Sequence, residues 1–244
     1  MASEFEIIVI SMISKEDRRR TVRENLSRMT GPSWRFFDAV NDAAVVEGLD
    51  SDPDRQIVRY GRTLGRAEVG CFKSHYLVLR EFVKSGTSDW IMVMEDDVIL
   101  DVNFNFQEVI EFCEKNNYNY IRLFAKMYKP ARIIAMLSQF RQVIRFSTDP
   151  YGAQCYLISK AGAAAVLNSI ETIELPIDDE FGRFWRHGQL PLSVFPFPAI
   201  ETSVPSSLSQ DRESGDERRI GRSIDLVMFR LKEKLRKELY NLRH

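Results

Sequence analysis

The sequence has few cysteines and lacks long apolar runs, a signal peptide and a glycine-rich phosphate loop. Its three cysteines, Cys71, Cys113 and Cys155, are odd in number and form no CxxC pair. This count argues against a disulfide framework or a structural zinc site and favours a reducing compartment. No apolar run approaches the roughly 20 residues that span a bilayer, and the N-terminal segment has no basic region followed by an apolar stretch. We therefore expect a cytoplasmic protein.

Composition and charge are those of an ordinary globular protein. The 244 residues are 44% hydrophobic and 28% charged, with a net charge of −1. The charge is uneven, because residues 222–244 have seven basic and three acidic side chains, which gives this segment +4 and the remainder −5. An acidic body argues against a nucleic acid partner. We predict one domain over residues 1–221 and a basic amphipathic helix over residues 222–244.

Apolar runs and helical periodicity alternate along the chain. The expected strands are 5–11, 34–40, 90–94, 120–123, 152–159 and 192–197, and the expected helices are 15–29, 67–83, 106–115, 161–169, 178–185 and 224–242. Such alternation predicts an α/β fold with a mostly parallel central sheet flanked by helices. The polar segment 203–221 is expected to be a loop, and residues 129–140 have no clear pattern.

The most informative feature is the acidic triplet Glu95-Asp96-Asp97, which directly follows the apolar run 90–94. Unpaired carboxylates are too costly to bury, so the strand is expected to leave the core and end on these acids. Ligands bind at the carboxyl ends of strands in open α/β sheets. Carboxylate oxygens suit Mn²⁺ or Mg²⁺ held against substrate phosphates. The triplet therefore predicts a metal-diphosphate site.

A second acidic cluster, which starts at Asp178, and two basic groups also have the chemistry of a site. Acids in a first helical turn favour the helix dipole, but a carboxylate there can also serve as a general base. Arg18 belongs to an arginine run at a helix start, and His75 lies in an otherwise core-facing helix. From these residues alone, a solvated helix face for Arg18 and a structural role for His75 are the simpler interpretations.

Several short motifs follow one another in a specific order. They are Val9-Ile10-Ser11 with Asp17-Arg18-Arg19, Phe36-Phe37-Asp38-Ala39, Gly70-Cys71-Phe72-Lys73-Ser74-His75, Glu95-Asp96-Asp97-Val98, Ile121-Arg122-Leu123, Lys160-Ala161-Gly162, Ile177-Asp178 and Ser207-Leu208-Ser209-Gln210-Asp211. In this order the chain resembles glycosyltransferase family 25, which includes bacterial enzymes that extend lipopolysaccharide or lipooligosaccharide cores. The resemblance covers nearly all of the chain up to about Gly221.

This resemblance implies a GT-A-like fold and an inverting transfer of a hexose from a UDP-sugar, most often galactose or glucose. The implied acceptor is a hydroxyl of a lipopolysaccharide or lipooligosaccharide core sugar. The implied roles are Asp97 and Asp96 as ligands of Mn²⁺ or Mg²⁺, Arg18, His75, Glu95, Asp96 and Arg122 in donor binding, Asp178 as catalytic base, and Gln154 and Asp211 on the acceptor or lid side.

Two other functions fit parts of the sequence. A nucleotidyltransferase also uses strand-end carboxylates with a metal, although the chain lacks the glycine-rich phosphate loop of many such sites. A non-catalytic, membrane-associated protein that binds a sugar or nucleotide is the other alternative.

The C-terminal segment has two interpretations. Its apolar residues recur at helical spacing with basic residues between them, as in helices that lie on anionic membranes. This interpretation would place the protein peripherally on the inner membrane. Equally, the apolar stripe could pack on the body or on a second copy.

Overall fold

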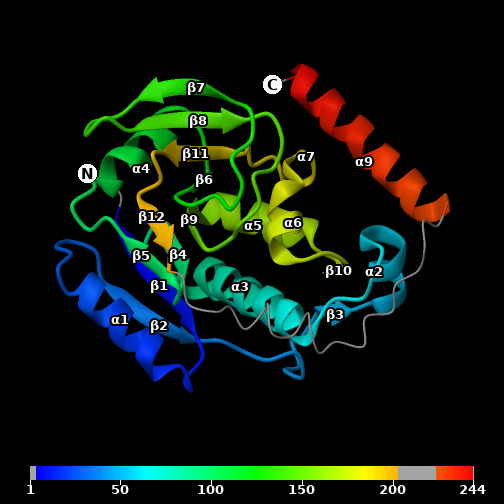
Figure 1. Cartoon of the computed structure of the whole chain (residues 1–244), viewed down its shortest axis with the longest axis horizontal. Helices are drawn as coiled ribbons and strands as arrows, with labels where there is room; N and C mark the ends of the chain where they lie inside the picture. Colours follow the sequence, from blue (N-terminus) through cyan, green and yellow to red (C-terminus); the bar gives the residue numbers. More distant parts are fainter. Residues whose placement is uncertain (1–3, 203–223, 244) are drawn as a thin grey trace.

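A central eight-stranded sheet organises the computed structural model, which describes residues 4–202 and 224–243 (Figure 1). The strands are β1 (Phe5–Ser11), β2 (Trp34–Asp38), β3 (Asp50–Ser51), β4 (Trp90–Glu95), β5 (Val98–Leu100), β6 (Tyr120–Arg122), β7 (Ala131–Met136), β8 (Gln142–Phe146), β9 (Cys155–Ser159), β10 (Thr172–Ile173), β11 (Leu192–Phe195) and β12 (Ala199–Glu201). The helices are α1 (Glu16–Leu26), α2 (Pro53–Tyr60), α3 (Arg66–Ser85), α4 (Phe106–Lys115), α5 (Lys160–Ser169), α6 (Ile177–Gly182), α7 (Phe184–His187) and α9 (Ile224–Arg243). The predicted loop 203–221, with Asp211 and the domain boundary, lies outside the described residues.

The predicted α/β class is confirmed, but the sheet is mixed rather than mostly parallel. The strand order is β2-β1-β4-β9-β6-β11-β8-β7. Strands β2, β1 and β4 are parallel, whereas β9 runs antiparallel between β4 and β6, and β8 is antiparallel to both β7 and β11. The prediction failed because a buried apolar run such as that of β9 has the same composition in either direction.

Strand β4 is apolar on both faces because both faces of the sheet are covered. Trp90, Met92 and Met94 pack in one hydrophobic cluster, and Ile91 and Val93 pack in another. All five side chains are at most 2% exposed. This double burial explains the uninterrupted apolar run, and it fixes the point where the first polar side chains of β4 emerge.

Helix α9 packs against the body through α2 and α7. Its buried Glu233 pairs with the buried Arg183, with 2.7 Å between Oε2 and Nε. The ring of Tyr240 meets that of Phe184 edge-on at a centroid distance of 5.5 Å. Among the described residues, no helix combines the length and apolarity that crossing a membrane requires.

A buried histidine should make stability depend on pH. The hydrogen bonds of His187 fit the neutral imidazole, which has one donor and one acceptor nitrogen. Its Nε2 donates to the carbonyl oxygen of Phe181 at 3.2 Å, and its Nδ1 accepts from the amide of Gln189 at 3.2 Å. Burial lowers the pKa of His187 from 6.5 to about 4. The unfolded chain therefore binds this proton first, and stability that is present above pH 6.5 is lost as pH falls toward 4.

We expect this group alone to cost about 2 kcal/mol of unfolding free energy between pH 7.5 and pH 5. The measurement is urea unfolding of the wild type and of His187→Gln at both pH values. The variant should lose less stability over this interval than the wild type. An identical loss in both proteins would contradict a neutral, buried His187.

Candidate active site

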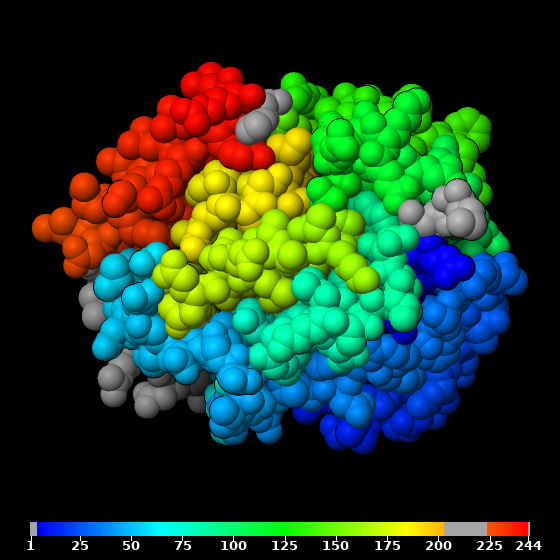
Figure 2. All heavy atoms as spheres, turned by 180° about the vertical axis from the view of Figure 1, so that it is seen from behind, coloured from blue at the N-terminus to red at the C-terminus, as the bar shows by residue number. Residues whose placement is uncertain are grey.

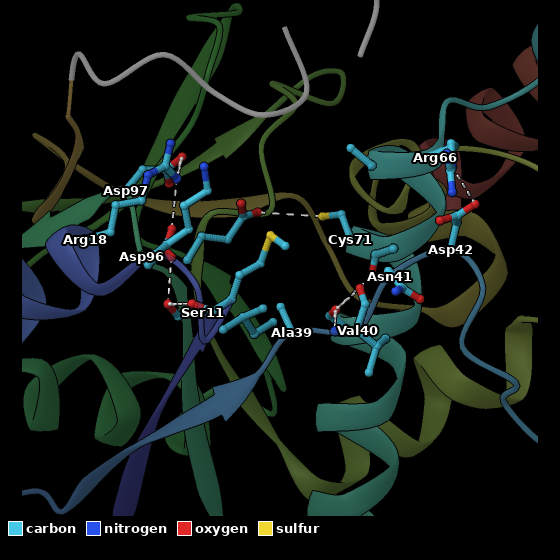
Figure 3. A pocket seen from close by; sticks show the side chains of 17 residues that line it. Ser11, Arg18, Ala39, Val40, Asn41, Asp42, Arg66, Cys71, Asp96 and Asp97 are labelled. Atoms are coloured by element: carbon cyan, nitrogen blue, oxygen red, sulfur yellow. Dashed lines mark hydrogen bonds and ion pairs between the residues drawn. The ribbon is translucent and has the colours of Figure 1, made fainter. Parts of the chain in front are cut away.

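The acidic triplet lies at the edge of the sheet where β1 and β4 both end. The two strands are parallel, so Ser11 and Glu95 reach this edge together, and Asp96 and Asp97 form the turn that follows. The Ser11 hydroxyl donates to Oδ2 of Asp96 at 2.7 Å, and Arg18 of α1 donates to Oδ1 at 2.9 Å (Figure 3). The Arg18 guanidinium is also 3.5 Å from Oδ2 of Asp97.

The carboxylate of Asp97 is buried without full compensation of its charge. Its Oδ1 has no hydrogen-bond partner among the described residues. Burial and the neighbouring Glu95 raise the pKa of Asp97 to about 7, against the opposing effect of Arg18. A buried carboxylate oxygen without a partner is suited to a divalent cation, which would supply the missing positive charge. Asp96 is less suited, since Ser11 and Arg18 occupy both of its oxygens.

The Gly-Cys-Phe-Lys-Ser-His motif of α3 forms the opposite wall. A Cβ at Gly70 would lie 2.9 Å from the carbonyl oxygen of Val40, so only glycine lets the chain after β2 approach so closely. Ser74 accepts a hydrogen bond from the amide of Val40 at 3.0 Å. The buried Lys73 donates to the carbonyl oxygen of Ala44 at 2.8 Å. These contacts hold the segment after β2 against α3.

A cavity of about 370 Å³ lies between the acidic triplet and this wall. Lys15, Arg18 and Arg66 contribute basic groups to its lining, and Arg18 and Arg66 lie on opposite sides (Figure 3). Basic side chains beside a strand-end carboxylate suit a phosphate-bearing ligand with its metal. We call this space the triplet cavity.

His75 and Cys71 lie behind Glu95. The fully buried His75 has Nδ1 3.0 Å from the Tyr156 hydroxyl and Nε2 3.4 Å from Oε1 of Glu95. The Cys71 sulfur is 4.0 Å from the same oxygen, and burial raises the pKa of this thiol. His75 lines neither this cavity nor the next one described. Its contacts instead orient the Glu95 side chain.

A second cavity, of about 350 Å³, lies on the other side of Glu95 and contains Asp178. We call it the Asp178 cavity. Cys71 and Glu95 line both cavities, so the two spaces meet at these side chains. Gln154 also lines the Asp178 cavity, and its buried Oε1 has no hydrogen-bond partner among the described residues. An unpartnered amide oxygen is suited to accepting a hydrogen bond from a ligand hydroxyl.

The environment of Asp178 combines burial with charge. Its Oδ1 accepts a hydrogen bond from the amide of Asp179 at 3.1 Å. Burial raises the pKa of Asp178, and Asp149 raises it further, while Arg122 opposes them. Burial and Asp178 raise the pKa of Asp179 to about 7. A carboxylate with a raised pKa is a stronger proton acceptor when it is ionised.

Arg122 is placed beneath the site rather than in it. The guanidinium is 1% exposed, donates to the Tyr120 hydroxyl at 2.9 Å and pairs with Asp149. It lines neither the triplet cavity nor the Asp178 cavity. The structure thus brings Arg18, Glu95, Asp96 and Asp97 to one cavity and Gln154 and Asp178 to the other, with Arg122 and His75 as supports.

Three residues of this region have contacts that were not predicted from the sequence. Asp149 pairs with Arg122, Tyr151 lines the Asp178 cavity and Cys71 lies at the junction of the cavities. Tyr151 and Gly152 have φ angles of 60° and 93°, a left-handed turn that is uncommon for a bulky aromatic residue. The Asp-Pro-Tyr-Gly sequence is a turn signal that could have indicated this feature.

The chain belongs to glycosyltransferase family 25. Residues 5–181 match this family, which is described as "LPS biosynthesis protein". The family and the α/β fold predicted from the resemblance are thereby confirmed. The segment Gly70–His75 and the acidic triplet of this chain both lie in the matched region.

Curated relatives include proteins with contrasting names. The human "Inactive glycosyltransferase 25 family member 3" is 33% identical over 186 residues, which cover 71% of this chain and 30% of the relative. "Procollagen galactosyltransferase 1-A" of Xenopus laevis is 28% identical over 185 residues, with the same coverage. The chain therefore spans about a third of the length of these relatives. One of these relatives is named as inactive and the other as a galactosyltransferase, so a function for this chain has to be argued from the residues of its own site.

Two solved structures are similar at low identity. One is a glycosyltransferase involved in the glycosylation of the major capsid of PBCV-1, with a TM-score of 0.38, 10% identity and coverage of 68% of this chain and 65% of the other. The second is A197 from STIV, with a TM-score of 0.41, 11% identity and coverage of 78% and 81%.

Proposed function

We propose that this protein transfers a hexose, galactose or glucose, from a UDP-sugar to a sugar hydroxyl with inversion of the anomeric configuration. The observation that supports this function best is the pair of adjoining cavities. One contains basic side chains and Asp97, whose Oδ1 has no hydrogen-bond partner among the described residues, and the other contains Asp178. A diphosphate in the first and an acceptor hydroxyl in the second would place the transferred sugar near Glu95, where the cavities meet.

In this mechanism the chain binds the donor and removes one proton. Arg18, Lys15 and Arg66 attract the diphosphate, and Asp96 or Glu95 binds the ribose or the sugar. Asp97, with Asp96 beside it, would hold Mn²⁺ or Mg²⁺, which when bound supplies a Lewis acid that stabilises the departing diphosphate. Asp178 accepts the proton of the acceptor hydroxyl as its oxygen bonds to the anomeric carbon and the bond to UDP breaks. One displacement inverts the configuration.

We further propose a lipopolysaccharide or lipooligosaccharide core sugar as acceptor. The description of the matched family supports this choice. The named activity of the procollagen galactosyltransferase relative supports galactose as the first sugar to test.

The test is UDP release from a panel of UDP-sugars, with Mn²⁺ or with EDTA, and with or without a truncated lipopolysaccharide core. We expect release from one UDP-hexose that requires both the metal and the core. Release of pyrophosphate from a nucleoside triphosphate and a sugar phosphate would instead establish a nucleotidyltransferase. UDP binding without turnover of any donor would favour the non-catalytic alternative.

A further inference from the structure

Helix α9 presents most of its apolar side chains to solvent rather than to the protein. Seven of them are between 50% and 83% exposed, namely Ile224, Val227, Met228, Leu231, Leu235, Leu239 and Leu242. Their spacing of three or four residues places them in one stripe along the helix. We call them the outer stripe. A surface helix of a globular protein ordinarily turns such a stripe toward the core.

The opposite side of α9 docks on the body. Leu226 and Glu233 are buried there, and the pair of Glu233 with Arg183 fixes the rotation of the helix about its axis. Figure 2 shows α9 in red along the surface, with its outward side uncovered by other described segments. The outer stripe therefore faces outward because a specific buried ion pair holds the helix in this orientation.

Basic side chains flank the outer stripe. At 100° per residue, Lys232 and Arg243 lie along one edge of the stripe together with Asp225, and Lys234 lies along the other edge. Glu238 falls among the stripe residues. Neither lysine has a carboxylate within 4.0 Å among the described residues. Over residues 224–243 there are six basic and three acidic side chains, a net charge of +3. Two copies of such a helix would repel one another, whereas an anionic surface would attract each of them.

We propose that α9 lies in the interface of an anionic membrane, with the outer stripe among the acyl chains and the flanking lysines at the headgroups. Apolar burial and attraction to anionic lipid are the two contributions that hold such a helix. A helix of 20 residues is about 30 Å long, so the stripe offers an extended contact.

The body-facing side of α9 adjoins the Asp178 cavity. A third cavity, of about 470 Å³, is lined by Phe229 and Arg230 of α9 and shares Tyr60, Tyr151 and Asp179 with the Asp178 cavity. If the proposed function holds, a lipid-linked acceptor held beside α9 would reach Asp178 through this third cavity. The membrane contact itself does not depend on that function.

The experiment is flotation of the full-length protein with vesicles of phosphatidylcholine and phosphatidylglycerol, compared with vesicles of phosphatidylcholine alone. We expect binding to the anionic vesicles and weaker binding to the neutral ones. Leu235→Glu, at a 57% exposed position, should lower the bound fraction about tenfold or more. Val45→Glu, at a 98% exposed position away from α9, is the matched control and should bind like the wild type.

A charge variant gives an independent second measurement. The double change Lys232→Gln and Lys234→Gln should weaken binding to anionic vesicles roughly fivefold or more and leave the melting temperature unchanged. Absence of flotation, or equal flotation of the wild type and Leu235→Glu, would overturn the proposal. So would a lipid-free dimer in sedimentation equilibrium that Leu235→Glu dissociates, because the stripe would then join two copies. All of these readouts are independent of sugar transfer.

Discussion

Replacing Asp178 with asparagine should lower turnover by roughly 10²–10⁴-fold and leave the affinity for UDP nearly unchanged. Asparagine keeps the size of the side chain but cannot accept the proton of an attacking hydroxyl. Asp178 lies in the cavity beyond Glu95, away from Asp97 and the basic groups of the triplet cavity. The measurements are the initial rate of UDP release at saturating donor and acceptor, and calorimetric binding of UDP with Mn²⁺.

Asp179→Asn is the matched control, since this neighbour lines the same cavity and undergoes the same replacement of a carboxyl group by an amide. It should retain much more turnover than Asp178→Asn. Equal loss in both variants would assign the effect to the charge of the cavity rather than to a base. Loss of UDP binding in Asp178→Asn would make Asp178 a structural or metal-binding group.

The change Asp97→Asn should have two opposite effects. Metal-stimulated turnover should fall by roughly 10³-fold, because the amide removes the charge that would hold the cation. Asp96→Asn, whose carboxylate is already engaged by Ser11 and Arg18, should reduce the response to Mn²⁺ less. A titration of turnover against Mn²⁺ concentration compares the two variants.

The second effect of Asp97→Asn is a gain in stability without metal. The folded-state pKa of Asp97 is raised from 3.8 to about 7, so its ionisation weakens the folded state as pH rises through this interval. The variant should therefore gain stability over the wild type at pH 8 in EDTA, with about 4 kcal/mol as the upper limit, and no advantage near pH 3. Denaturant unfolding at both pH values measures this. An Asp97→Asn protein that is less stable than the wild type at pH 8 would contradict the conclusion that the buried Asp97 charge lowers the unfolding free energy.

The segments that the sequence predicted best have one unambiguous pattern. The strand β1 and the helix α4 begin and end at the predicted residues, because a short apolar run and a helical stripe define them. The direction of β9 relative to its neighbours could not be predicted, since a buried apolar strand has the same composition whether it is parallel or antiparallel to them. Likewise, the sequence pattern of α9 predicts an apolar stripe but does not predict whether that stripe faces the body of the protein or the solvent. That choice depends on Glu233 and Arg183, which are 50 residues apart.

The site was predictable where chemistry follows directly from residue type. The triplet at the end of β4 could be predicted because acids are expected to end a buried strand, but the burial of Asp97 could not, since it runs against the cost of burying an unpaired carboxylate. Arg122 and His75 were harder to place, because a buried polar side chain can contact a ligand or support a neighbour, and only its contacts distinguish these roles. Asp149 was missed because its importance comes from Arg122, which lies 27 positions away in the chain.

The pairing of α9 with Arg183 also bears on how the protein should be shortened for study. Arg183 directly follows α6, the helix that begins with Ile177 and Asp178. A chain cut near residue 221 would leave the buried Arg183 with Glu180 as its remaining ion-pair partner and the ring of Phe184 without Tyr240. Removal of one carboxylate from this buried ion-pair network is expected to destabilise the folded state. Low activity of a truncated protein would therefore reflect a disturbed structure beside the proposed base rather than a role of α9 itself. Single substitutions on the outer side of α9 are the sounder way to study this helix.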